Sequence, residues 1–317
     1  MDKRLDCVVC GSCVVDVLVH PVSLDNPVGA GRLVRTEPLV LTTGGIVSNA
    51  GITLARLGMR VAAMTYVGDD PWAEVVRTRY QAEGIEIETL RTHPNAPTST
   101  TAVLIDSSGE RSFLHAVGAP KQLDKSAFLD RLDLFASSRI MLLGYFPLLP
   151  NLLDDLPTVL QAIKGVGCQT ALDSAGDGGK LEHLQPSLPY LDYYVPSLAE
   201  ATHQTLETDP VKIIQAYREA GASGTLGVKL GRDGALLSPR ARSYIEVPPV
   251  SPPGPLVDTT GAGDCFFGGL LCGLLNDLDL ASAGQLASAA GASCVTGLGA
   301  TTAISDYGAT ARLAGLI

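Results

Sequence analysis

The chain has 317 residues, 46% of them hydrophobic and 5% aromatic, and 23 basic against 33 acidic residues give a net charge of −10. This length and composition are typical of one large or two small well-packed α/β domains, and they exclude a disordered chain. Nucleic-acid binding requires clustered Lys and Arg, and the sequence contains no basic run, so we expect no nucleic-acid partner.

The sequence also predicts no contact with membranes. Its first residues, MDKRLDCVV, lack the apolar region and cleavage site of a signal peptide, and no apolar run free of charge and turn signals reaches about 18 residues. We therefore expect a soluble cytoplasmic protein.

Residues 5–19 are apolar and β-rich, and they predict one central strand. The spacing of Cys7, Cys10 and Cys13 is also used by metal clusters. In a strand, however, Cys7 and Cys10 face opposite sides, and no fourth cysteine follows nearby. The odd count of seven cysteines is typical of reduced thiols, so we expect no metal or cluster here.

Two strand-rich pieces predict a second, smaller sheet. Residues 33–42 contain Pro38 and predict an edge strand. Residues 99–115 predict a hairpin that turns at 106–109.

Polar residues at predicted strand and helix ends are candidate ligand contacts. Asp16 lies near a strand end, where open α/β sheets bind ligands; the alternative is a turn aspartate before Pro21. Gly44 and Gly45 precede a predicted helix at 48–57, and their bare backbone lets a substrate approach closely. Asn49 offers both a donor and an acceptor, or it is an ordinary helix-start residue.

Alternating strands and helices predict a parallel sheet with right-handed crossovers. The predicted strands cover residues 61–67, 85–90, 139–144, 168–173, 191–195 and 225–230, and the predicted helices cover residues 71–82, 151–164 and 209–220. Asp173 ends one strand at the ligand edge. Ser197 and Glu200 have the spacing of a helix capping box. Lys229 precedes a turn at 231–234, and a solvated lysine is one interpretation of it.

The stretch VDTTGAGDCF at 257–266 follows a Pro-rich run and leads into a predicted apolar helix at about 262–276, followed by a second helix at 280–295. The chain turns at Gly261 and Gly263, and backbone N–H groups at such a helix start hold an anion. Asp264 lies in the same turn. A carboxylate beside these amides suits phosphoryl transfer, because it takes the proton of the attacking hydroxyl. The alternative is a glycine turn with Asp264 as a helix-start charge.

DTTGAGDCF resembles the C-terminal signature of the ribokinase-like (PfkB) carbohydrate kinases. GGIVSNAGITLARLG at 44–58 resembles their N-terminal signature, and GSCVVD, VGDD and GVKLGRDGALL follow the family order. The resemblance covers about residues 5–305, and no P-loop motif is present. It implies a single ribokinase-like α/β domain over 1–317: a mostly parallel sheet with helices on both faces, and a small β lid from about 31–44 and 98–118.

The resemblance implies an ATP-dependent kinase that transfers the γ-phosphoryl to a hydroxymethyl group of a sugar or sugar acid. Asp264 would be the general base, and the amides of Ala262, Gly263 and Asp264 would hold the migrating charge. The implied contacts to the acceptor are made by Asp16, Gly44, Gly45 and Asn49, and those to the nucleotide by Lys229, Gly231, Gly234 and Gly263. The turn glycine Gly261 completes the catalytic set.

The resemblance also implies ATP, Mg²⁺ and K⁺ as cofactors. Glu200 would act on Mg²⁺ through water, although Ser197 stands where the family usually has Asn. A monovalent cation would lie between Asp258, Thr259 and the loop at 297–300, unless Asp258 only bonds backbone groups.

Two alternatives to a sugar kinase remain open. A nucleoside kinase shares these motifs but needs an aromatic shelf for the base, for which Phe113 and His115 are candidates. A non-catalytic sugar or nucleotide sensor is disfavoured by Asp264 and its glycines. The sequence names neither the acceptor nor the oligomeric state, although small sheets of this kind often pair between subunits and suggest a homodimer through the lid.

Overall fold

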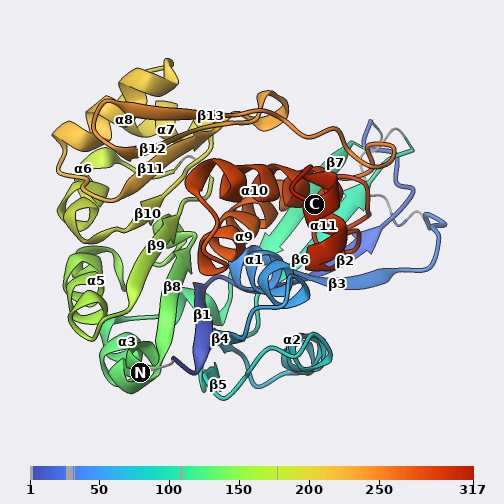
Figure 1. The fold of residues 1–317 in the computed structure, drawn as a ribbon. Helices are drawn as coiled ribbons and strands as arrows, with labels where there is room; N and C mark the ends of the chain where they lie inside the picture. The colour runs from blue at the N-terminus through green and yellow to red at the C-terminus, as the bar shows by residue number, and fades with distance from the viewer. Residues whose placement is uncertain (1–2, 26–30, 32, 108–109, 177) are drawn as a thin grey trace.

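The computed structural model describes residues 3–25, 31, 33–107, 110–176 and 178–317, and these residues form two separate sheets (Figure 1). The large sheet has the strand order β13-β12-β11-β10-β9-β8-β1-β4-β5. Its strands are β1 (Leu5–Gly11), β4 (Val61–Val67), β5 (Leu90–Thr92), β8 (Ser138–Gly144), β9 (Gln169–Asp173), β10 (Tyr193–Tyr194), β11 (Thr225–Lys229), β12 (Ala235–Arg240) and β13 (Ser243–Val247). All pairs are parallel except β11–β12 and β12–β13 at one edge. The predicted mostly parallel sheet is confirmed.

Helices cover both faces of the large sheet (Figure 1). They are α1 (Gly45–Arg56), α2 (Pro71–Ala82), α3 (Lys125–Leu129), α4 (Leu132–Ala136), α5 (Leu156–Gly165), α6 (Leu181–Leu184), α7 (Leu198–Thr205), α8 (Pro210–Glu219), α9 (Ala262–Leu275), α10 (Leu280–Cys294) and α11 (Tyr307–Leu313). Side chains of β1 alternate between two cores: Cys7 and Val9 pack with α1, α9 and α10, and Val8 and Cys10 pack with α5 and α8. As predicted, Cys7 and Cys10 face opposite sides.

The prediction of one strand over residues 5–19 is wrong. The strand β1 ends at Gly11, and β2 (Val14–Val19) belongs to the small sheet. The reason is that the neighbours of β1 end here, since Gly11 pairs with Gly144, the last residue of β8. The chain therefore leaves the large sheet and starts a second one.

The small sheet has the order β3-β2-β6-β7, with β3 (Val40–Gly44), β6 (Thr100–Ile105) and β7 (Arg111–Ala116). The predicted hairpin is the antiparallel pair of β6 and β7, although residues 108 and 109 of its turn lie outside the described residues. The predicted strand at 33–42 begins only at Val40, but it is an edge strand as expected.

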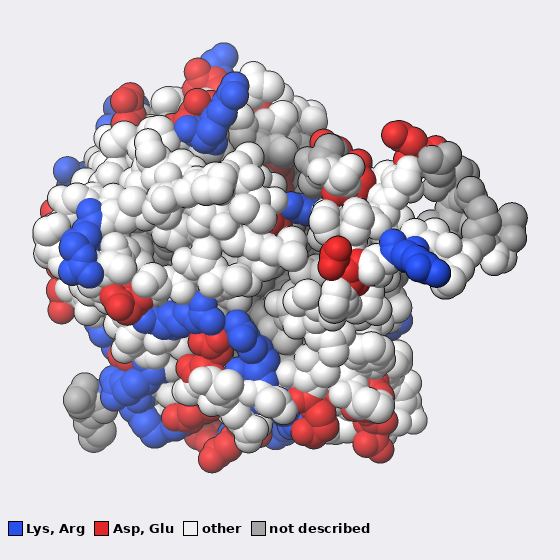
Figure 2. Space-filling model, turned by 90° about the vertical axis from the view of Figure 1, so that its right-hand side faces the viewer, with Lys and Arg blue, Asp and Glu red and all other residues white. Residues whose placement is uncertain are grey.

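Acidic and basic side chains are interspersed over the lower half of the face shown in Figure 2, and they form no continuous basic surface there. Among the helices that the structure describes, none combines the length and the apolar character needed to cross a membrane.

Candidate functional site

The chain enters α9 through a tight turn at Gly261. Its φ is +75°, in the left-handed region, and a Cβ at this position would lie 2.4 Å from the Cβ of Ala300, so only glycine fits. Of the three amides expected to hold an anion, that of Ala262 donates to the Thr259 carbonyl at 3.3 Å. The amides of Gly263 and of the next residue belong to the first helical turn, whose N–H groups have no acceptor within the helix.

Asp264 is buried, 5% exposed, in this first turn of α9. Its Oδ2 accepts hydrogen bonds of 2.7 Å from Asn49 Nδ2, on α1, and of 2.7 Å from the Tyr145 hydroxyl, just after β8. Burial raises the pKa of Asp264, although the Asn49 amide, the Lys229 charge and the Tyr145 hydroxyl oppose the rise. A carboxylate with a raised pKa is a stronger proton acceptor than an ordinary aspartate.

Tyr145 itself has an uncommon backbone. Its φ of 61° lies in the left-handed region, which residues other than glycine rarely adopt and which is enriched at functional sites. This conformation belongs to the turn that carries the Tyr145 hydroxyl to Asp264.

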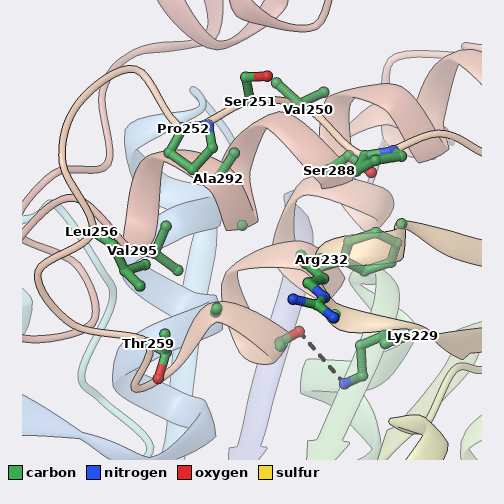
Figure 3. Close-up of a pocket in the computed structure, with 17 residues that line it drawn as sticks. Lys229, Arg232, Val250, Ser251, Pro252, Leu256, Thr259, Ser288, Ala292 and Val295 are labelled. Carbon is green, nitrogen blue, oxygen red and sulfur yellow. Dashed lines mark hydrogen bonds between the residues drawn. The ribbon is translucent and has the colours of Figure 1, made fainter.

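A cavity of about 610 Å³ opens beside the start of α9 (Figure 3). Lys229 lies at one end, with its Nζ 3.5 Å from the carbonyl oxygen of Gly263, and Gly231 and Gly234 line the same cavity. The stretch 250–252 lies at the opposite end (Figure 3). Many of the other lining side chains are apolar, among them Leu256, Phe266, Ala292 and Val295, and Arg232, Ser251, Thr259 and Ser288 add polar groups. The cavity thus has a cationic end beside the helix start and a remainder of mixed character.

Lys229 is not a solvated lysine. It is 9% exposed, and its Nζ lies 3.0 and 3.1 Å from the two carboxylate oxygens of Asp173. Burial lowers the pKa of Lys229, but the charge of Asp173 and the carboxylates of Glu200 and Asp264 outweigh that effect, so the net pKa is raised. The ammonium group therefore stays charged next to the first turn of α9.

A second cavity, of about 270 Å³, is lined by both the small sheet and the start of α1. All four residues predicted to contact an acceptor line it: Asp16, Gly44, Gly45 and Asn49. Asp16 Oδ2 lies 2.3 Å from the place that a Cβ of residue 44 would take, so a side chain at this position would displace the Asp16 carboxylate. Burial, with a contribution from the Asp258 charge, raises the pKa of Asp16 to about 6.

Asn49 lines this second cavity and carries an unsatisfied buried atom. Its Nδ2 donates to Asp264, but its buried Oδ1 has no partner among the described residues. Because a buried polar atom without a partner is costly, this oxygen is suited to accept a hydrogen bond from a bound hydroxyl.

The side chains of Asp258 and Thr259 have different neighbours. Asp258 Oδ1 accepts the Thr260 N–H at 2.7 Å and forms an ion pair of 2.7 Å with Nη1 of Arg111, from β7. Its Oδ2 accepts the Gly299 N–H at 2.9 Å. Thr259 instead lines the 610 Å³ cavity (Figure 3). The side chains of these two residues thus face different surroundings, and their joint binding of a monovalent cation stays a prediction.

Ser197 and Glu200 form a capping box at the start of α7. The Ser197 N–H donates to Glu200 Oε2 at 2.7 Å, and the Glu200 N–H donates to Ser197 Oγ at 3.3 Å. Among the described residues, no group of three or more His, Cys, Asp and Glu side chains is arranged to hold a metal ion. The capping interpretation is confirmed, and a link between Glu200 and Mg²⁺ stays a prediction.

Three contacts of the site lie outside the sequence prediction. Tyr145 was missed because the local sequence GYFP contains no pattern that predicts a contact between its hydroxyl and Asp264. Arg111 was missed because its partner lies 147 positions away. Asp173 was predicted at the ligand edge, but its pairing with Lys229 depends on a register that local spacing does not give.

The fold and this site define a class of protein. A buried carboxylate lies between residues that line two cavities, beside helix-start amides and a buried lysine, in an α/β domain; this is the arrangement of an enzyme that acts on two small molecules.

The pattern that defines the pfkB family carbohydrate kinases matches residues 4–306, so the chain belongs to this family. It is 30% identical to a fructokinase of Klebsiella pneumoniae, over 93% of this chain and 95% of the relative, and 26% identical to a ribokinase of Haemophilus influenzae, over 90% and 91%. The fold matches that of an Arabidopsis thaliana ribokinase complexed with ribose and ATP, with a TM-score of 0.82, 23% identity and 98% of each chain covered. Family members are phosphotransferases that act on sugar hydroxyl groups, and the protein is a sugar kinase of this family.

Proposed function

We propose that the protein transfers the γ-phosphoryl group of ATP to a hydroxymethyl group of a monosaccharide or sugar acid. The observation that carries this proposal is the position of Asp264 between two cavities. Ala262 and Gly263 beside it line the larger cavity, and its two hydrogen-bond donors, Asn49 and Tyr145, line the smaller one.

The larger cavity is the proposed nucleotide site. Lys229 at its charged end attracts phosphates, and the apolar side chains farther along, among them Leu256 and Val295, accommodate a purine. A solved relative of this fold, a ribokinase II of E. coli with a TM-score of 0.81, holds ATP and Mg²⁺. Mg²⁺ is usually bound by one or two carboxylates plus substrate phosphates, so the lack of a ready-made acidic cage among the described residues fits it. Glu200 is the proposed carboxylate, and the ion would neutralise charge on the phosphates.

The smaller cavity is the proposed acceptor site. Its 270 Å³ lies just below the range of about 300–1,000 Å³ that is typical of drug-sized ligands, which favours a monosaccharide. Asp16 accepts hydrogen bonds from ring hydroxyls, and Asn49 Oδ1 accepts one more. Gly44 and Gly45 let the sugar lie against the backbone.

Proton transfer follows from this placement. Asp264 removes the proton from the acceptor hydroxyl, the hydroxyl oxygen forms a bond to the γ-phosphorus, and the bond from that phosphorus to the β–γ bridging oxygen breaks to release ADP. The amides of Gly263 and Asp264 stabilise negative charge on the moving group, and the turn at Gly261 aims them. The amide of Ala262 donates to the Thr259 carbonyl, so it contributes by closing the turn and not by binding the moving group.

A nucleoside acceptor is the second candidate. Phe113 and His115 of β7 line the acceptor cavity and provide an aromatic surface for a base. A relative 28% identical over 82% of this chain is an aminoimidazole riboside kinase of Salmonella typhimurium.

We further propose that the single domain uses the small sheet as a lid over the acceptor. The sheet also carries exposed apolar residues suited to a homodimer contact, among them Val40, Leu41, Phe113 and Leu114. The cytoplasm is the proposed location, because all seven cysteines are free thiols and ATP is the proposed donor.

The test is ADP release measured against a panel of ketoses, aldoses, sugar acids and nucleosides. We expect turnover with one sugar or sugar acid at least tenfold above any nucleoside. A nucleoside as best acceptor would support the second candidate, and ATP binding without turnover on any acceptor would contradict the kinase proposal.

A further inference from the structure

The carboxylate of Asp258 lies where a monovalent cation was expected, but its surroundings do not fit one. Its two oxygens already have three partners, namely Arg111 Nη1 and the N–H groups of Thr260 and Gly299. The side chains of Asp258 and Arg111 are 5% and 14% exposed, so this is a largely buried ion pair.

The carbonyl oxygens nearby also have donors. Arg111 Nη2 donates to the Val257 carbonyl at 3.1 Å. The Cys265 thiol donates to the Ala300 carbonyl at 3.4 Å, and the Cys294 thiol donates to the Thr260 carbonyl at 3.3 Å. A hard cation needs several protein oxygens turned toward it. These oxygens are instead engaged by an arginine and two thiols.

We propose that the guanidinium group of Arg111 replaces the monovalent cation and holds the turn before α9 in its active shape. It bonds Val257, Asp258 and Thr260, which are three of the four residues before Gly261; the bond to Thr260 Oγ1 is 3.1 Å. One fixed positive charge therefore neutralises the buried carboxylate and fixes the segment that aims the amides. This inference rests on the proposed function of that turn.

Arg111 also links this turn to the acceptor site. It is the first residue of β7, and Phe113 and His115 of the same strand line the acceptor cavity. A free cation would order the turn whatever the position of the small sheet. A cation attached to β7 orders it only when the small sheet lies over the cavity. Arg111 is therefore a positioning residue. Through it, the shape of the turn before α9 depends on whether the small sheet lies over the acceptor cavity.

The experiment compares wild type with Arg111→Ala in KCl and in tetramethylammonium chloride at equal ionic strength. We expect the wild-type kcat to be the same in both salts. In tetramethylammonium, Arg111→Ala should lose about tenfold or more in kcat, since one charge-assisted hydrogen bond corresponds to roughly a ten- to hundredfold change in rate. Its KM for ATP should change less.

Chemical rescue distinguishes positioning from simple loss of stability. K⁺, or guanidinium ion far below denaturing concentrations, should restore kcat of Arg111→Ala, and the added substitution Asp258→Asn should abolish the rescue. The matched control is Arg240→Ala, an exposed arginine at the end of β12 that lines neither cavity, which should behave as wild type. K⁺ stimulation of wild type, an unchanged kcat in Arg111→Ala, or a folded Arg111→Ala that neither ion rescues would each overturn the proposal.

A second readout needs no acceptor. The melting temperature of Arg111→Ala should be higher in KCl than in tetramethylammonium chloride, and that of wild type should be equal in both. If no acceptor supports turnover, the proposed function fails, and this comparison still decides the role of Arg111: equal melting temperatures in both salts for the variant would overturn it.

Discussion

The Oδ2 atom of Asp264 receives two hydrogen bonds, and both come from residues that line the acceptor cavity. An acceptor hydroxyl approaching the carboxylate therefore meets Asn49 and Tyr145 at the same point. In the proposed mechanism, the group that removes the proton and the groups that orient the acceptor form one hydrogen-bonded unit.

Replacing Asp264 with Asn tests its role as base. The substitution keeps the size and the helix start but removes the proton acceptor, so kcat should fall by about 10²–10⁴. ATP affinity, measured by calorimetry, should persist, because Lys229 and the amides of α9 remain. Tyr145→Phe is the matched comparison: it removes a donor to Asp264 but not the base, and we expect a smaller loss. A fall in kcat of less than tenfold in folded Asp264→Asn would show that another group is the base.

The raised pKa of Asp16 predicts a pH effect on acceptor binding. Only its ionised form accepts two hydroxyl hydrogen bonds, and its pKa is about 6 in the folded protein. As the pH falls through 6, the carboxylate takes up a proton, and the acceptor KM should rise. The check is to measure the acceptor KM between pH 5 and 8. The control variant Asp16→Asn should have a high KM that does not change as the pH passes through 6. An identical step in the variant would assign it to another group.

The sequence predicted the residues of this site that are close to a motif. Asp264 with its glycines, and Gly44, Gly45 and Asn49, follow from local spacing and from the family resemblance. The partners that complete the site, Tyr145 and Arg111, come from distant segments. Their roles depend on how β8 and β7 are placed, and no short pattern encodes that placement.

The helix α9 is held by glycines packed against α10. A Cβ added at Gly269 would lie 2.9 Å from the Cα of Ala287, and one at Gly273 would lie 2.7 Å from the Cα of Ala283. The two helix axes approach closely because these positions have no side chain. This packing fixes the direction in which the first turn of α9 points.

Gly273→Ala should therefore destabilise the protein even though alanine favours helices. Overpacking typically costs about 1–3 kcal/mol, which outweighs the gain of roughly 1 kcal/mol in helix propensity. The control is Gly165→Ala at the exposed end of α5, where a Cβ meets nothing within 4 Å and stability should be unchanged or slightly higher. Chemical denaturation of the two variants measures the difference, and equal midpoints would contradict the packing argument.

At the level of elements, the sequence predicted most strands and helices and the presence of a second sheet, but it assigned residues 14–19 to the wrong sheet. The expected strand at 5–19 became β1 and β2, because its neighbours in the large sheet end at Gly11. The apolar pattern continues through this point, since both halves are buried against different partners. Periodicity reports burial, and it does not report which sheet provides it.

For the whole molecule, the small sheet predicts a dimer. Its exposed apolar residues include Leu114, 62% exposed on β7. We expect sedimentation to give the mass of a dimer, and Leu114→Glu to shift it to a monomer. Leu206→Glu, at an even more exposed leucine (87%) at the end of α7, is the control and should remain dimeric. A wild-type monomer at micromolar concentration would contradict this assembly.

The seven buried cysteines have a consequence for measuring how the protein opens. Burial raises the pKa of Cys13 and Cys272 to about 12, so these thiols are both shielded and unreactive in the native state. An alkylating reagent can then label these thiols only in molecules that have unfolded locally. Cysteines on α9 and α10 would record separation of those helices, and those on β1 would record opening of the central sheet. The order in which the two groups of cysteines are alkylated therefore shows which half of the fold opens first.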